Sequence, residues 1–384
     1  MVSAVDHVNE FPSGGNHPAV PAAQHASESA QRVAYLDGIR ALAIGGVLAY
    51  HWLGSQLSLG GGGYVGVDLF FVLSGYIIST MLWRSRPRGR SVVAQYRTFL
   101  WRRVVRLYPA LISLVLGTIT IYALLPAARA QVADLIAPGL LALVQGSMFP
   151  MANGNGTPFS ITWSLSIEWM FYLAWPLAIL AARRAGIGAS QAAKAATILA
   201  GAMYFGALFQ TVNWFNFGPL ARIPEMLIGG ALALAVVDFS YHPPPRSPRI
   251  AMGIAFLLVA VTAEYVAFAP VVATPLYRFV GLPLAVGTCL NLIWLGLRTE
   301  NGLIKWLSWK PLTLLGRASY SIYLWNLIGV DLFLRHNGHD QPLVVVGAEA
   351  FGLALAVVSY RFVELPFMRS ERSALVSPAP GPVT

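Results

Sequence analysis

Apolar runs long enough to cross a lipid bilayer recur along this chain between residues 34 and 363, and short polar segments separate them. A membrane-spanning helix needs roughly 20 predominantly apolar residues. Runs of this kind predict helices at residues 34–53, 64–83, 104–125, 159–182, 195–212, 220–237, 250–269, 276–297, 320–334 and 343–363. The pattern therefore predicts an all-α fold, a polytopic membrane helix bundle with about ten transmembrane helices.

The segment 134–149 is ambiguous, because it is short, moderately apolar and interrupted by Pro138 and Gly139. Lys and Arg gather in the cytoplasmic loops of membrane proteins, so their distribution indicates whether the segment crosses. With ten spans and a cytoplasmic N-terminus, 19 of the 26 Lys and Arg residues fall in inner segments and two in outer loops. If the segment also crossed the membrane, 9 of the Lys and Arg residues would lie inside and 12 outside. We therefore expect one short re-entrant or surface helix on the outer side, and both termini in the cytoplasm.

Both ends of the chain differ in composition from its centre. Residues 1–32 are rich in Ala, Ser, Gly, Pro and His and lack the charged start and apolar middle of a secretory signal, and residues 369–384 are similar. Such segments bury too little apolar surface to fold. We expect a disordered cytoplasmic leader at 1–32, one transmembrane domain at 33–368 and a disordered cytoplasmic tail at 369–384, with no soluble catalytic domain appended.

The composition narrows the possible partners. Hydrophobic residues make up 56% of the chain and charged residues 11%, which does not suit a water-facing surface. The net charge of +10 lies mostly in short loops between apolar runs, so we expect contact with membrane lipid and no nucleic acid. Cys289 is the single cysteine and lies in an apolar run, so neither a disulfide framework nor a cysteine-based metal site is expected.

Arg40 and His51 form the first candidate pair. An ionisable side chain within a span costs roughly 2.5–3.5 kcal/mol to insert, so each one marks a candidate functional site. Their spacing of eleven residues places both on one face of a continuous α-helix, about 16 Å apart along its axis. Imidazole suits proton transfer from a hydroxyl near neutral pH. The alternative is a structural, hydrogen-bonded His51 and an Arg40 that extends to the membrane interface.

A basic cluster follows at Arg102, Arg103 and Arg106. Arg102 and Arg106 lie one helical turn apart, with Arg103 beside them. Guanidinium groups bind phosphate oxygens through paired hydrogen bonds, so the cluster could hold a pyrophosphate or sugar phosphate at the inner membrane face. The alternative is a plain anchor for membrane orientation.

A polar stripe is predicted on the helix at 159–182, where Ser160, Ser164, Glu168 and Tyr172 recur every four residues. A lone carboxylate in lipid is protonated unless a cation accompanies it. Glu168 could orient or stabilise a catalytic imidazole. The alternative is a structural salt bridge to an Arg of another helix.

Asp68 and Ser74 lie in a further candidate segment, which follows the glycines at 60–63. The glycines allow close approach of backbones, and Asp68 is another acid within a span. The alternative is helix packing through glycine, with Asp68 as a cap near the interface.

Tyr320 and Asn326 belong to the polar sequence of the ninth run. In the tenth run, Arg361 and Glu364 are three residues apart, and on an α-helix they could neutralise each other. None of these signals is decisive by itself.

Together and in this order, the motifs resemble the membrane acyltransferase-3 family, whose members acylate sugars and antibiotics. The matching elements span residues 35 to 366 and are the Arg40/His51 pair, the run from Gly66 to Gly75, the cluster Arg102-Arg-x-x-Arg106, Trp163-Ser-Leu-x-x-Glu168 and Tyr360-x-x-x-Glu364-x-Pro366. Each element is weak alone, but the ordered set is specific.

The resemblance implies a role for each matching position. His51 would be the catalytic histidine, as general base or transient acyl carrier, with Arg40 as its required partner. Glu168 would orient or polarise His51. The cluster Arg102/Arg103/Arg106 would bind the phosphates of acyl-CoA, most simply acetyl-CoA, from the cytoplasm. Asn326 stands where family members often have histidine, which puts an acid–base role there in doubt.

Two classes of function follow from the sequence. The first is an O-acyltransferase of a bacterial cytoplasmic membrane, which moves an acetyl or other short acyl group from acyl-CoA to a hydroxyl. Its acceptor would be a small molecule or glycan, with macrolide antibiotics or their sugars favoured by the expected lack of a second domain. The second is a transporter or carrier that uses the same buried charges as a relay.

Overall fold

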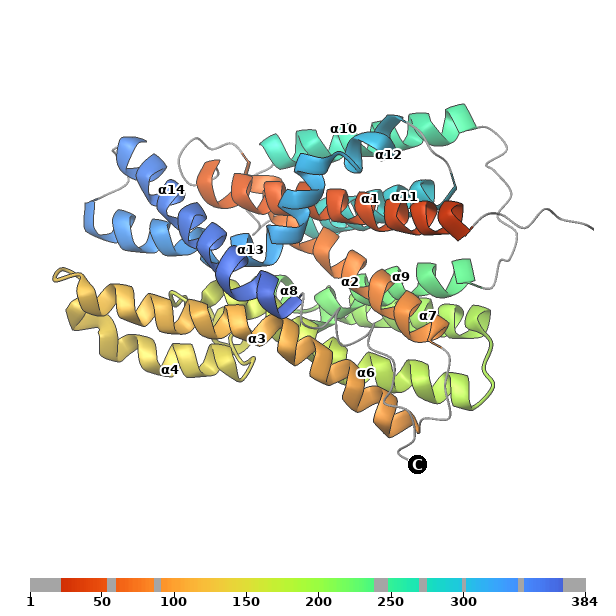
Figure 1. The fold of residues 1–384 in the computed structure, drawn as a ribbon, viewed down its shortest axis with the longest axis horizontal. Helices are drawn as coiled ribbons and strands as arrows, with labels where there is room; N and C mark the ends of the chain where they lie inside the picture. Colours follow the sequence, from red (N-terminus) through yellow and green to blue (C-terminus); the bar gives the residue numbers. More distant parts are fainter. Residues whose placement is uncertain are drawn as a thin grey trace, which may run out of the picture.

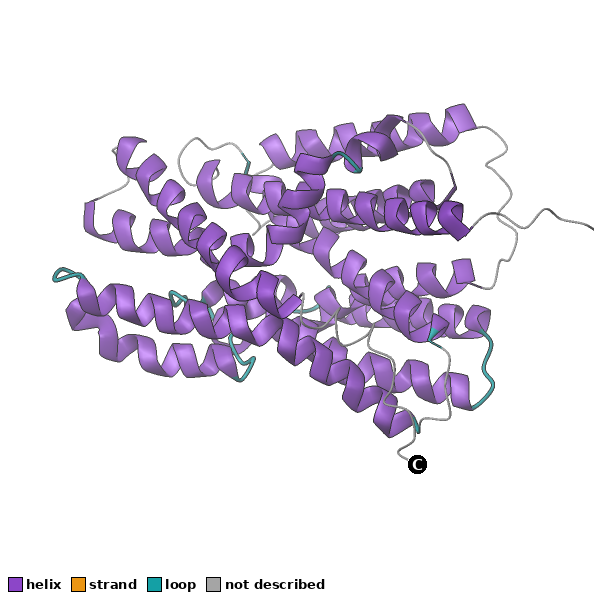
Figure 2. Cartoon of the chain, viewed as in Figure 1, coloured by secondary structure: helices purple, strands orange, loops and turns teal. Residues whose placement is uncertain are grey.

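The computed structural model describes residues 22–53, 60–85, 91–237, 248–268, 275–298, 302–337 and 342–368. Helices make up nearly all of these residues and no strand occurs among them (Figure 2). Most helices run along the long axis of the molecule, with α1, α10 and α11 in the upper part of the view and α3, α4 and α6 in the lower part (Figure 1). The described part of the chain is therefore the expected helical bundle.

The first half of the bundle begins with a long helix that ends in a π-helical turn. Its elements are α1 (Ala22–Leu48), η1 (Ala49–Leu53), η2 (Gly61–Tyr64), α2 (Val65–Arg84), α3 (Val92–Leu124), η3 (Arg129–Gln131), α4 (Val132–Leu143), α5 (Met148–Ala152), η4 (Ser160–Thr162) and α6 (Trp163–Arg184). Here η1 is π-helical, whereas η2, η3 and η4 are 3-10 turns.

The second half contains two more π-helical turns, η5 and η6. Its elements are α7 (Ala189–Ala207), α8 (Val212–Phe217), α9 (Pro219–Val237), α10 (Pro248–Phe268), η5 (Tyr277–Gly281), α11 (Leu282–Arg298), α12 (Gly302–Leu307), α13 (Lys310–Asn337), α14 (Pro342–Val358) and η6 (Ser359–Glu364).

Each of the ten predicted segments falls on a helix of this structure, although α7 ends five residues earlier than expected. Among the described residues, six stretches are long and apolar enough to cross a membrane, namely Gly61–Arg84, Val92–Leu124, Ser160–Arg184, Val212–Val237, Tyr277–Leu297 and Val346–Met368. These helices establish a multi-pass helical membrane bundle. The count of ten crossings stays a prediction.

The ambiguous segment contains a short helix, as expected, whereas the start of the first helix differs from the expectation. The ambiguous segment contains α4, whose 12 residues span only about 18 Å, too short for a hydrocarbon core of about 30 Å. It lies along α3 (Figure 1). At the N-terminus, α1 begins at Ala22, inside the leader expected to be disordered, because this segment contains the good helix formers Ala, Gln and Glu. The rest of the predicted leader and the predicted tail lie outside the described residues.

Glycines set the spacing of α2 and α9. A Cβ atom on Gly75 would lie 1.9 Å from the carbonyl oxygen of Met226, and one on Gly229 would lie 2.0 Å from that of Val72. Small residues allow such approach in membrane bundles, where packing replaces the hydrophobic effect as the driving force. The close contact with α9 holds α2 in the interior of the bundle, where α2 also packs against α1.

Candidate functional site

A cavity of about 320 Å³ lies between α1, α2, α3, α6 and α13. Its wall consists of Leu36, Asp37 and Arg40 from α1; Val67, Phe70, Phe71, Ser74, Ile77 and Ile78 from α2; Arg103, Arg106 and Leu107 from α3; Ser164, Leu165, Glu168 and Tyr172 from α6; Arg317, Ser319, Tyr320 and Tyr323 from α13; and Met368 after η6. The cavity therefore joins segments from both ends of the chain.

Most of the predicted site residues meet in this cavity. Those that line it are Arg40, Ser74, Arg103, Arg106, Ser164, Glu168, Tyr172 and Tyr320. Those outside its wall are His51, Asp68, Arg102 and Asn326.

Four guanidinium groups and two carboxylates face the cavity, which gives it an excess of positive charge. Arg317 donates from Nε to Oδ2 of Asp37 at 2.9 Å. The Nε of Arg40 is buried and has no hydrogen-bond partner among the described residues. The guanidinium of Arg103 lies 5.5 Å from the ring centroid of Tyr172. A surplus of guanidinium donors around a cavity suits a ligand that carries several phosphates.

The basic cluster differs from the prediction in its membership. Arg103 and Arg106 share the cavity-facing side of α3, while Arg102, one residue earlier, is not part of the wall. Arg40 and Arg317 complete the set instead. The sequence interpretation missed Arg317 because it counted this residue only as an orientation charge before the ninth run.

Glu168 lies in the middle of the polar stripe on α6. Its Oε1 accepts a hydrogen bond from Oγ of Ser74 at 2.9 Å, and its Oε2 accepts one from the hydroxyl of Tyr172 at 2.8 Å. Nδ1 of His51 is bonded to Asn326 and not to Glu168, so the expectation that Glu168 orients His51 stays a prediction.

His51 lies in the π-helical turn η1, and its Nδ1 is 2.6 Å from Oδ1 of Asn326. The Nδ2 of Asn326 donates to the carbonyl oxygens of Tyr323 at 2.6 Å and Ile322 at 3.3 Å, which leaves Oδ1 as the acceptor. Nδ1 of the imidazole must therefore carry a proton, and in the neutral ring Nε2 then holds the lone pair. This is the tautomer that a general base needs.

The π-helical turn interrupts the α-helix between Arg40 and His51. The prediction that Arg40 and His51 share a face assumed an unbroken α-helix, but a π turn contains more residues and rotates the side chains that follow. Arg40 lines the cavity, whereas His51 is not part of its wall and bonds to Asn326 of α13.

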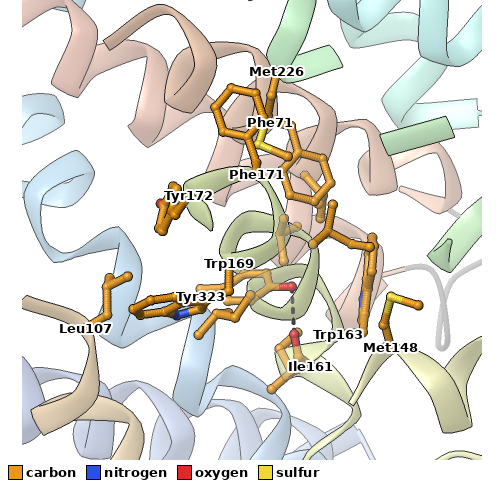
Figure 3. Close-up of a cluster of buried hydrophobic side chains, with 14 of the residues drawn as sticks. Phe71, Leu107, Met148, Ile161, Trp163, Trp169, Phe171, Tyr172, Met226 and Tyr323 are labelled. Carbon is orange, nitrogen blue, oxygen red and sulfur yellow. Dashed lines mark hydrogen bonds between the residues drawn. The ribbon is translucent and has the colours of Figure 1, made fainter. Parts of the chain in front are cut away.

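The deep end of the cavity is apolar and aromatic. Phe71, Leu107 and Tyr172 line the cavity together with Tyr323, whose hydroxyl is directed at the carbonyl oxygen of Ile161, 2.9 Å away (Figure 3). The cavity thus has a charged end at the arginines and an apolar end towards His51.

Asp68 belongs to a separate, fully buried polar centre. Nη1 of Arg222 lies 2.6 Å from Oδ1 of Asp68 and 3.1 Å from Oε1 of Glu225, and Tyr277 donates to Asp68 at 2.9 Å. The guanidinium also lies over the rings of Tyr64 and Tyr277 at 5.0 and 5.3 Å. Sequence reasoning missed Arg222 and Glu225, although their spacing of three within an apolar run was a visible signal.

The predicted pair of Arg361 and Glu364 also differs from the expectation. Glu364 is buried and accepts a hydrogen bond from Oγ of Ser321 at 2.6 Å, while Arg361 is exposed. The prediction that the two neutralise each other is wrong, because both lie in the π-helical turn η6, where residues three apart no longer share a face.

Among the described residues, no group of His, Cys, Asp and Glu side chains forms a metal-binding cluster.

Comparison with known proteins adds independent information. The sequence pattern of a family described as "Acyltransferase domain" matches residues 33–361. The chain is 30% identical over 379 residues to YrhL of Bacillus subtilis (strain 168), which covers 89% of this chain and 56% of the relative. No solved structure matches it.

Two further relatives carry names that state an activity. The peptidoglycan O-acetyltransferase OatA of Listeria monocytogenes is 29% identical over 379 residues, covering 89% of this chain and 57% of the relative. The O-acetyltransferase OatA of Staphylococcus aureus (strain NCTC 8325) is 27% identical over 359 residues, covering 87% and 57%. The chain thus spans a little over half the length of these relatives.

Proposed function

The chain belongs to the acyltransferase-3 family, and from this premise we propose that it transfers an acetyl or other short acyl group from acyl-CoA to a hydroxyl of a glycan. The names of the relatives favour a glycan over the macrolide acceptor that the sequence also allowed. No comparison supports the transporter alternative. We place the enzyme in the bacterial cytoplasmic membrane with both termini in the cytoplasm, following the distribution of its positive charges.

The proposal depends on the juxtaposition of the arginine-lined cavity and the imidazole. Arg103, Arg106 and Arg317 offer donors for the phosphates of CoA. The apolar deep end accepts the acyl portion of the thioester, and His51 lies beyond that end on Asn326. Acyl-CoA is thereby held as a co-substrate, with its reacting carbon directed towards the imidazole.

The chemistry follows from the tautomer of His51. The acceptor oxygen bonds to the thioester carbonyl carbon while Nε2 takes the hydroxyl proton. The carbon–sulfur bond then breaks, and the CoA thiolate takes that proton. In the alternative route, Nε2 bonds to the carbonyl carbon, the carbon–sulfur bond breaks and CoA leaves as the thiolate. The acceptor oxygen then bonds to that carbon, the Nε2–carbon bond breaks, and the hydroxyl proton goes to the thiolate. Asn326 holds the ring in both routes.

The test is acyl transfer by the purified protein in lipid nanodiscs, with radiolabelled acetyl-CoA and soluble peptidoglycan fragments. His51→Ala should lower labelled glycan and CoA release by about 10²–10⁴-fold, because a general base contributes this much. Lys194→Ala, an exposed site on α7, should keep the wild-type rate. Full turnover by a correctly folded His51→Ala protein would refute the assignment.

A further inference from the structure

The deep end of the cavity is closed by one tyrosine and one serine. The hydroxyls of Ser164 and Tyr323 are 2.7 Å apart, and Tyr323 donates to the carbonyl oxygen of Ile161 at 2.9 Å. Since Tyr323 has one proton and gives it to Ile161, Ser164 must donate to Tyr323. The ring of Tyr323 is thus held from two sides.

The candidate catalytic pair is bonded to the backbone of the same tyrosine. Asn326 follows Tyr323 by one turn on α13, a rise of about 4.5 Å. Its Nδ2 bonds to the carbonyl oxygen of Tyr323, and its Oδ1 bonds to His51. Tyr323 lines the cavity, whereas Asn326 and His51 do not, so Tyr323 is the cavity residue whose backbone is bonded to the Asn326–His51 pair.

Two antiparallel helices give the cavity a direction. On α6, Tyr172 lies beside Arg103, and Ser164 lies two turns earlier beside Tyr323. On α13, Arg317 precedes Tyr323 by six residues, about 9 Å along the axis. Phosphates held at the guanidinium groups therefore leave the acyl end of the donor at the phenol ring.

We propose that Tyr323, held by Ser164, determines which acyl groups the enzyme transfers and restricts it to short ones. This inference rests on the proposed function. For the thioester carbon to reach His51, the ring must be displaced and its hydrogen bonds to Ser164 and Ile161 opened. An acetyl group needs the smallest displacement, whereas each added methylene must occupy volume that the ring fills, and a methylene in a closed pocket changes transfer rates by about 10–200-fold.

The test is an internal competition between acetyl-CoA and hexanoyl-CoA with peptidoglycan fragments as acceptors, with both products quantified by mass spectrometry. Because both donors compete for the same enzyme, the product ratio is independent of the folded fraction. Tyr323→Ala should raise the hexanoyl-to-acetyl ratio at least tenfold. Tyr323→Phe, which keeps the ring but loses its hydrogen bonds, should change the ratio less than Tyr323→Ala does.

Tyr320→Ala is the matched control, because Tyr320 lines the same cavity one turn nearer the arginines and donates to the carbonyl oxygen of Leu107 at 2.9 Å. It enlarges the cavity away from the deep end and should leave the ratio near the wild-type value. An unchanged ratio in Tyr323→Ala, or an equal rise in Tyr320→Ala, overturns the inference. If Tyr323→Ala fails to fold, Tyr323→Leu takes its place with the same criterion. If the wild-type protein makes neither product, the proposed function itself fails.

Discussion

Replacing Arg222 with methionine removes the guanidinium that Asp68 and Glu225 share inside the bundle. The exposed fractions of these three side chains are 0%, 0% and 1%, and the two ion pairs measure 2.6 and 3.1 Å. Methionine has a similar length and no charge, so the substitution strands two carboxylates without opening a large void. The side chain also lies over three aromatic rings, so its contacts there change as well.

Breaking a buried ion pair by removing one partner costs about 3–5 kcal/mol, mainly because the other charge stays buried without compensation. We expect Arg222→Met to lose stability in this range, which lowers the midpoint of thermal unfolding by on the order of 10 °C. The assay is the fraction of protein that stays monodisperse after heating in detergent, followed by tryptophan-fluorescence size-exclusion chromatography.

Two further variants of the protein make this prediction specific. The triple variant Arg222→Met, Asp68→Asn and Glu225→Gln has no stranded charge, so it should regain most of the lost stability. Arg278→Met removes a half-buried arginine whose partners are backbone carbonyls and the ring of Phe215, and it should cost much less. An equal loss in Arg222→Met and Arg278→Met, or no recovery in the triple variant, would show that the buried carboxylates do not depend on Arg222.

Two other outcomes follow from the packing and from the charge of the cavity. Gly75→Ala should destabilise the protein by about 1–3 kcal/mol, since its Cβ would lie 1.9 Å from the carbonyl oxygen of Met226. The control Gly201→Ala has open space around its Cβ and should be neutral or stabilising. The same heating assay measures both variants. Arg317→Gln should raise the KM for acetyl-CoA about tenfold with little change in kcat, because a charged hydrogen bond to phosphate is worth about 1.5–3 kcal/mol. The control Arg84→Gln changes an exposed arginine and should leave both constants unchanged. Steady-state kinetics that show no rise in KM for Arg317→Gln would exclude Arg317 from donor binding.

The sequence predicted features that depend on a regular α-helix. Ser164, Glu168 and Tyr172 lie along one wall of the cavity as their four-residue spacing implies, because α6 keeps α-helical geometry over these positions. The ten helical segments were also predicted, since apolar length follows directly from the thickness of the bilayer.

Features that depend on contacts between distant segments could not be predicted. Asp68 and Arg222 are 154 residues apart, and nothing in one sequence pairs them. His51 and Asn326 are separated by 275 residues, so an acid on a motif helix was the natural candidate for a partner, and Asn326 was considered only as a departure from the family pattern. Pairing of this kind requires the packing of whole helices.

The π-helical turns account for another group of differences, and each carries a buried or partly buried polar side chain. Within the described residues, η1 carries His51, η5 carries Tyr277 of the Arg222 centre, and η6 carries Glu364. A residue inserted into an α-helix turns the following side chains away from the face that the regular spacing assigns to them. Hydropathy does not reveal such an insertion, because the apolar run stays continuous.

The partner of His51 has a chemical consequence of its own. A carboxylate at Nδ1 would stabilise the charged imidazolium, whereas the amide of Asn326 fixes the tautomer without adding charge within the bundle. Asn326 is itself held by backbone carbonyls of its own helix, so its oxygen has one available orientation. A histidine at this position could exchange a proton with His51, but an amide cannot. The proton that Nε2 takes in the proposed reaction must therefore leave by the same nitrogen, to the departing thiolate.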